Sequence, residues 1–259
     1  GEDVTALAAM PPSTFSVSPA SDLAEGSQAI SVRESDPAGN AVEATASFIE
    51  DRTAPSLSNP RPGDSSYVVE GRPTIGLDLS EALSGISAVQ LFVRGLDVTL
   101  QAQVTETSIS YTPVDPLSDG QVDVRAIAVD GALNVREVTW IFRVDTAAPE
   151  WREVSPEDSA LSQNRREAFD ATPFDAGSGV DASRIRLRLD GSDVTEAAEV
   201  DAGRVGFTPG EGLSLGAHSY EADLWDLAGN AAETLRVEFE IFDAVTSINR
   251  AEGGTATVT

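Results

Sequence analysis

The chain has 259 residues, of which 41% are apolar, so it has room for two or three domains of about 100 residues with real hydrophobic cores. Its 43 acidic residues outnumber 17 basic residues, all of them arginine, and this net charge of −26 excludes nucleic acid as a partner. The lack of cysteine excludes disulfides and thiolate metal sites, and no apolar run is long enough for insertion into a membrane.

Short β-strands are the elements that the sequence predicts along the whole chain. Apolar and polar residues alternate with a period of two, and Gly, Pro, Asp and Ser clusters separate the segments. No stretch has an apolar stripe at helical spacing, so the predicted class is all-β. In chain order the clearest strands are residues 29–35, 41–51, 73–80, 89–95, 121–130, 136–145, 183–191 and 218–226.

An internal repeat of about 95 residues organises these strands. The triplet DVT occurs at residues 3–5, 97–99 and 193–195. A turn that begins with Asp and ends with Asn occurs at residues 36–40, 130–134 and 226–230. Both motifs recur at spacings of 94 and then 96 residues. A repeat of this length is too long for a solenoid unit and suits a complete β-sandwich domain.

The repeat divides the chain into three copies and a tail. Residues 1–52 are the C-terminal half of a sandwich domain without its first strands, and residues 53–145 and 146–243 are complete domains. Residues 244–259 form a tail with a candidate extra strand. The constant spacing also predicts three pairs of equivalent inward positions: Val124 and Tyr220, Ala126 and Ala222, and Tyr111 and Phe207.

Three segments resemble bacterial Ig-like domains, which occur in tandem in large surface and adhesin-type proteins. They are GSGVDASRIRLRLDG (residues 177–191), DLAGN (226–230) and VDTAAP (144–149), and the similarity extends over residues 3–243. The segment DGALN (130–134) departs from the usual turn by exchanging Gly and Leu. The resemblance implies tandem Ig-like β-sandwich domains in an elongated array at an extracellular or cell-surface location. It does not specify a binding partner.

Acidic side chains in the turns are candidate ligands for Ca²⁺, which takes six to eight oxygen ligands. In an Ig-like sandwich the first strand begins at the end where two of the acidic loops lie. One predicted site therefore combines Asp51, Glu81, Asp130 and Asn134, and the other combines Asp145, Asp175, Asp226 and Asn230. Two alternatives stay open: Asp and Asn recur only because they close turns well, or Arg52 and Arg143 form salt bridges there.

We expect a non-catalytic protein, because a Ser–His–Asp triad would have to use the only histidine, His218, and no phosphate-loop or histidine metal motif occurs. The favoured function is a stalk or spacer that Ca²⁺ rigidifies between domains. The expected partners of the chain are proteins, either neighbouring Ig-like domains or copies of the chain itself. A surface ligand or carbohydrate is a further candidate partner. One alternative is a filament subunit whose incomplete first domain is completed by another chain. The other is an accessory region of a large secreted enzyme.

Overall fold

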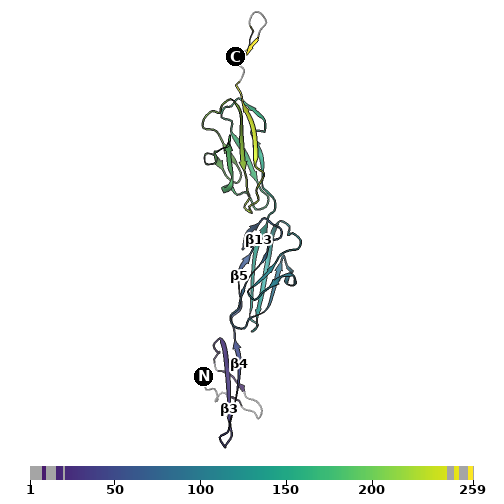
Figure 1. The fold of residues 1–259 in the computed structure, drawn as a ribbon, viewed down its shortest axis with the longest axis vertical. Helices are drawn as coiled ribbons and strands as arrows, with labels where there is room; N and C mark the ends of the chain where they lie inside the picture. The colour runs from purple at the N-terminus through teal and green to yellow at the C-terminus, as the bar shows by residue number, and fades with distance from the viewer. Residues whose placement is uncertain (1–7, 10–15, 20, 244–247, 251–255, 259) are drawn as a thin grey trace. The chain divides into compact units, whose positions relative to one another are not determined.

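The computed structural model of the chain describes residues 8–9, 16–19, 21–243, 248–250 and 256–258 (Figure 1). Within these residues the regular structure consists of β-strands and a few short 3-10 turns. The predicted all-β class is therefore confirmed. In the part of the chain that the model describes, no helix is both long and apolar enough to cross a membrane.

Residues 56–144 form a four-stranded and a five-stranded sheet. The four-stranded sheet has the order β10-β11-β7-β5, with strands Gln103–Val104, Ser108–Tyr111, Ile75–Ser80 and Ser56–Arg61. The five-stranded sheet has the order β6-β13-β12-β8-β9, with strands Ser66–Val68, Val135–Val144, Gly120–Asp130, Ile86–Val93 and Leu96–Asp97. β6 pairs with β13 in parallel, whereas β7, β8 and β11 make antiparallel pairs.

Residues 150–241 form two sheets with the same strand order. The first is β14-β16-β20-β19, with strands Glu150–Ser155, Phe169–Phe174, Val205–Phe207 and Glu199–Val200. The second is β15-β22-β21-β17-β18, with strands Ala160–Ser162, Leu235–Ile241, Gly216–Asp223, Arg186–Leu189 and Ser192–Asp193. The parallel pairing recurs between β15 and β22. Identical strand order is the structural counterpart of the sequence repeat.

Alternate residues of the central strands bury their side chains, as a sandwich requires. Tyr220 is fully buried in a cluster to which both sheets contribute, and its ring centroid lies 5.3 Å from that of Phe169 in the opposite sheet. Val124 in the preceding sandwich is 2% exposed, and Ala126 and Ala222 are fully buried. These two predicted pairs are therefore confirmed, whereas in the third pair Phe207 is buried and Tyr111 is only half-buried. The two sandwiches are Ig-like.

The DVT triplet has a local explanation in the structure. Asp97 Oδ1 accepts a hydrogen bond from the Thr99 backbone amide at 2.9 Å, and Thr99 Oγ1 accepts one from the Leu91 amide at 3.0 Å. Asp193 and Thr195 repeat the first bond at 2.9 Å, and Thr195 Oγ1 accepts from Leu187 N at 2.9 Å. The triplet thus starts a short 3-10 turn and supplies an acceptor to an adjacent strand.

The first copy contributes two small pairs of strands. β3 (Gly26–Ser35) pairs with β4 (Ala41–Glu50) as an antiparallel hairpin, and β1 (Ala8–Ala9) pairs with β2 (Ser16–Val17). In the tail, β23 (Ile248–Arg250) pairs with β24 (Ala256–Val258). The first DVT triplet, at residues 3–5, lies outside the described residues, as do tail residues 244–247, 251–255 and 259.

Replacement of Tyr220 by Ala tests the core of the third copy. Loss of a fully buried aromatic side chain should lower the free energy of unfolding by about 3–5 kcal/mol. Tyr220→Phe is the matched control, because it removes only the hydroxyl that donates to Glu167 O at 2.8 Å, a loss of about 0.5–1.5 kcal/mol. Urea denaturation monitored by fluorescence measures both changes, and equal effects of the two variants would contradict this core assignment.

Candidate metal centres

The turn from Asp to Asn has the same hydrogen bonds in all three copies. In the hairpin, Asp36 Oδ1 accepts from Asn40 N at 2.8 Å and Asp36 Oδ2 accepts from Asn40 Nδ2 at 2.6 Å. These bonds, chiefly those from Asn40, lower the pKa of Asp36. The corresponding distances are 2.8 and 2.9 Å in the second copy and 2.8 and 2.7 Å in the third.

Turn chemistry alone explains why this Asp and Asn recur. Among the described residues, Asp36 belongs to neither of the groups of closely spaced carboxylates, and its turn is nevertheless complete. A bound ion would therefore depend on other residues that join the turn in the second and third copies.

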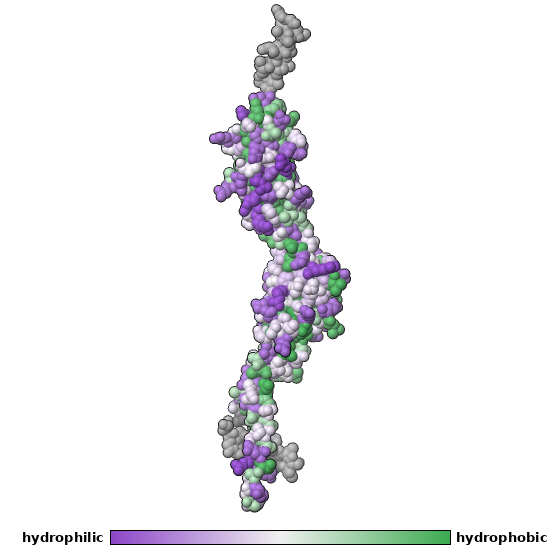
Figure 2. Space-filling model, in the orientation of Figure 1, coloured by the Kyte–Doolittle hydropathy of each residue, from purple (hydrophilic) through white to green (hydrophobic). Residues whose placement is uncertain are grey.

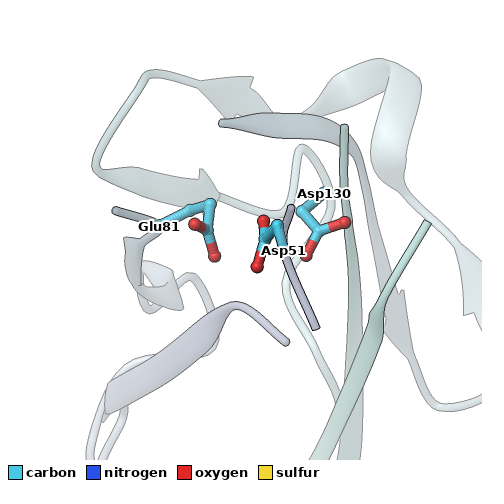
Figure 3. Close-up of side chains that lie close together, drawn as sticks. All are labelled: Asp51, Glu81 and Asp130. Carbon is cyan, nitrogen blue, oxygen red and sulfur yellow. The ribbon is translucent and has the colours of Figure 1, made fainter. Parts of the chain in front are cut away.

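Three carboxylates converge in the second copy. Asp51 follows β4, Glu81 follows β7 and Asp130 ends β12, and one oxygen of each lies within 4.8 Å of the others. Figure 3 shows the carboxylate of Asp51 between those of Glu81 and Asp130. Two oxygens that share one Ca²⁺ at about 2.3–2.6 Å can be at most about 5 Å apart. The spacing of the three groups is therefore compatible with a shared ion.

The third copy has an equivalent cluster. Asp145 follows β13, Asp175 follows β16, and Asp226 lies in the turn after β21, again with one oxygen of each within 4.8 Å of the others. Asp145 and Asp226 are each only 1% exposed. The structure thus brings together the three carboxylates of each predicted set. The carboxylates of the first cluster and those of the second occupy corresponding positions of the repeat.

Backbone and hydroxyl donors fix these carboxylates in place. The Leu83 amide donates to Glu81 Oε1 at 2.6 Å, and the amides of Gly177 and Gly179 donate to Asp175 Oδ2 at 3.0 and 2.6 Å. In the described part of the chain no hydrogen bond is formed by the second carboxylate oxygen of Glu81 or of Asp175. One oxygen in each cluster is therefore available to a ligand.

Among the described residues, no arginine forms an ion pair with either cluster. Arg52 pairs with Glu50, at 2.6 Å between Nη1 and Oε1, and not with Asp51. Within the described residues none of the ion pairs joins Arg52, Arg143 or any other arginine to the six cluster carboxylates. Like charges at this spacing repel unless a cation or a proton relieves them. Arg52 therefore does form a salt bridge, but with Glu50, and the alternative that it pairs with a carboxylate of the cluster is wrong.

Asn134 and Asn230 connect the elements of each cluster through their amide nitrogens. Asn134 Nδ2 donates to the Asp51 carbonyl at 3.1 Å, and Asn230 Nδ2 donates to the Asp145 carbonyl at 2.8 Å. Each asparagine thereby ties the turn to the segment that follows the preceding copy. Direct coordination of an ion by either asparagine stays a prediction.

Burial and hydrogen bonding act in opposite directions on Asp130. Burial of this fully enclosed side chain opposes its ionisation, but hydrogen bonds from Asn134 and from the Ala132 amide outweigh that effect. The pKa of Asp130 is therefore lower than usual. The turn thus favours the carboxylate form of this residue, which is the form that binds a cation.

The structure adds residues that the sequence reasoning missed. Ser84 Oγ donates to Asp51 Oδ2, and the Ser178 amide donates to Asp145 Oδ2 at 2.6 Å. Gly177 packs so closely on Asp145 that a Cβ atom would lie 2.5 Å from its carboxylate. Ser84 and Ser178 are 94 residues apart, as Glu81 and Asp175 are, so their spacing was the signal available in the sequence.

His218 lies between an aspartate and a serine, as in a catalytic triad, but its hydrogen bonds differ from those of a triad. Nδ1 is 2.7 Å from Asp190 Oδ2, and Nε2 is 3.0 Å from the Ser214 carbonyl and 3.4 Å from Ser214 Oγ. Both acceptors require a protonated nitrogen, whereas a triad histidine must accept the serine proton at Nε2. Although burial opposes a charge here, Asp190 and the Ser214 carbonyl raise the pKa of His218. This histidine clamps β21 to two neighbouring loops.

Comparison with known proteins yields structural similarity only. No protein-family model matches the chain, and no curated protein matches its sequence. The fibronectin(III)-like modules of CbhA from Clostridium thermocellum are 14% identical, with 76% of this chain and 99% of that chain covered and a TM-score of 0.39. A structure of titin Ig domains is 11% identical, with 75% and 68% covered and a TM-score of 0.48. At such low identity and score, the Ig-like class rests on the strand order and the buried alternation described above.

The His218 clamp should make the stability of the third copy depend on pH. Its pKa is raised in the folded state, so its stabilising effect is complete below the unfolded-state pKa of about 6.5 and is lost as pH rises through the folded-state pKa. Urea denaturation of the wild type and of His218→Gln between pH 5.5 and 9 isolates this effect from that of the carboxylates. The difference in unfolding free energy should shrink with rising pH, and a constant difference would contradict the protonated clamp.

Proposed function

We propose that the chain is a non-catalytic structural segment, a stalk or spacer of an extracellular or cell-surface protein, in which Ca²⁺ rigidifies the Ig-like copies. The observation that carries this proposal is the presence of two equivalent triads of carboxylates without a basic partner among the described residues. The Ig-like fold and its tandem repetition support a mechanical role. The resemblance to bacterial surface and adhesin-type domains supports the location.

Each proposed ion connects segments that are distant in the sequence. In the first site Asp51 comes from the segment after the hairpin, and Glu81 and Asp130 come from two loops of the next copy. The second site combines Asp145, Asp175 and Asp226 in the same way. An ion held by all three carboxylates would cross-link the connecting segment to both loops. Asn134 and Asn230 would either complete the ligand set or keep the carboxylates in position.

A weak site is sufficient for this role outside the cell. Extracellular calcium modules bind with dissociation constants of about 10⁻⁴–10⁻³ M. The clusters offer one carboxylate oxygen without a protein donor at Glu81 and one at Asp175, and the other ligands would be carbonyl oxygens and water. A cation that binds only the folded state raises the free energy of unfolding by RT ln(1 + c/Kd), where c is the free cation concentration.

Calcium titration tests the proposal. Relative to EDTA, excess Ca²⁺ should raise the melting temperature of the wild-type chain, because the ion removes the repulsion within each cluster. Glu81→Gln and Asp175→Asn each remove one charge and keep an oxygen that can accept the existing amide hydrogen bonds. Each variant should lose the calcium response of its own copy and retain that of the other, as measured by calorimetry and hydrogen exchange.

Glu211→Gln is the matched control, since Glu211 is an exposed acidic residue of the third copy outside both clusters. It should leave the calcium response unchanged. If the clusters instead hold a proton, stability will increase as pH is lowered without Ca²⁺, and calcium will have no effect on the melting of the wild type. That result would refute the cation sites and leave the sandwich fold as the only basis for a spacer role.

A further inference from the structure

The hairpin of β3 and β4 has one apolar and one polar face. In its register Gln28 lies opposite Phe48, Ile30 opposite Ala46 and Val32 opposite Ala44, so these residues share a face. The other face carries Ser31. Its hydroxyl donates a hydrogen bond to the carboxylate of Glu43 and lies 3.2 Å from the hydroxyl of Thr45. On the apolar face Ile30 is 40%, Val42 65% and Phe48 38% exposed, and Figure 2 shows hydrophobic residues at the surface of the hairpin.

Neither outer edge of this hairpin pairs with another described strand. A two-stranded hairpin is at best marginally stable in water, and an open edge with an apolar face recruits further strands. The hairpin in isolation is therefore an incomplete structural unit.

The repeat shows what covers the equivalent face elsewhere in the chain. Ile30 corresponds to Val124 and Tyr220, which are 2% and 0% exposed. The ring of Tyr220 lies 5.3 Å from that of Phe169 and 6.3 Å from that of Phe207, both on the opposite sheet. A sheet with large apolar side chains thus occupies the space over the position of Ile30.

The repeat also shows which strand pairs with the equivalent edge. Val32 corresponds to Ala126 and Ala222, and in both sandwiches the residue opposite is a leucine, Leu91 or Leu187. Two positions further along, the residues opposite the equivalents of Ile30 are Val93 and Leu189. A strand that pairs with the free edge of β3 should therefore be antiparallel, with leucine opposite Val32 and an aliphatic residue opposite Ile30.

The apolar face of the hairpin differs from the equivalent faces of the complete copies by one charge, and this charge restricts which partner can cover it. Glu34 stands where the complete copies have Ala128 and Leu224, which are 0% and 1% exposed. Covering the hairpin would bury this carboxylate, which is unfavourable unless a basic residue pairs with it. In the second copy the residue opposite the equivalent position is Val89. A second copy of the hairpin has no basic residue on its apolar face to pair with Glu34, which argues against a second copy as the occupant.

We propose that the β3–β4 hairpin is a docking site for the leading strands of an Ig-like domain of the same repeat type. These strands cover the face around Ile30 and pair with the edge of β3, with leucine opposite Val32 and Arg or Lys opposite Glu34. The proposal follows from the register of the hairpin and the repeat, and it is independent of the cation sites.

The full chain with a second copy of residues 53–96 fused before Asp3 tests the proposal, because Asp3 takes the place of Asp97 in the repeat. The added segment should slow amide exchange in β3 and β4, bringing it toward that of β12 and β13 in the same molecule, and should add a cooperative unfolding transition. Val89→Arg in the added copy should slow exchange further, and Glu34→Gln should abolish that gain.

Leu91→Asp in the added copy is the matched control and should restore the exchange rates of the unextended chain, while β21 and β22 of the third copy stay unchanged. Equal exchange in β3 with and without the extension would overturn the proposal. So would full protection of β3 in the unextended monomer. Protection that appears only on dimerisation of the unextended chain would identify a second copy as the occupant and would also overturn it.

Discussion

Burial of alternate side chains between two sheets is the constraint on which the rest of this structure depends. A strand such as β12 or β21 can turn every second residue inward only if another sheet covers that face. Tyr220 shows the result, since its ring contacts aromatic rings on both sheets of the third copy. Once this alternation fixes the register, the positions of the loops follow. Asp130 and Asp226 reach their clusters because the strands before them are in register.

The fold could be predicted from the sequence because its signals are local and are repeated. Alternation with a period of two identified strands such as β7 and β12, and the constant spacing of the DVT triplets identified equivalent positions. Very short strands such as β9 and β18 gave no such signal, because two residues carry no periodicity. They form because two-residue turns at Arg94–Gly95 and Asp190–Gly191, with both residues at positive φ, fold the chain back onto β8 or β17.

The candidate sites could be predicted only in part. Asp51, Glu81 and Asp130 were expected to converge because Ig-like topology places their loops at one end of the sandwich, and they do. The sequence could not show that Asn134 turns its amide nitrogen toward the Asp51 carbonyl, because the orientation of a side-chain amide depends on its neighbours. It also did not reveal that His218 contacts Asp190, since these two residues are 28 positions apart along the chain.

The hairpin and the clusters reveal two separate uses of one turn. Asp36 and Asn40 close the hairpin with the same hydrogen bonds that close the turns at Asp130 and Asp226. The turn itself therefore requires only its own side chains. In the complete sandwiches further carboxylates join the turn, as the buried Asp51 and the half-buried Glu81 do. The turn and the acidic cluster are consequently separate features of the chain. The cluster, not the turn, is the feature on which the proposed cation sites depend.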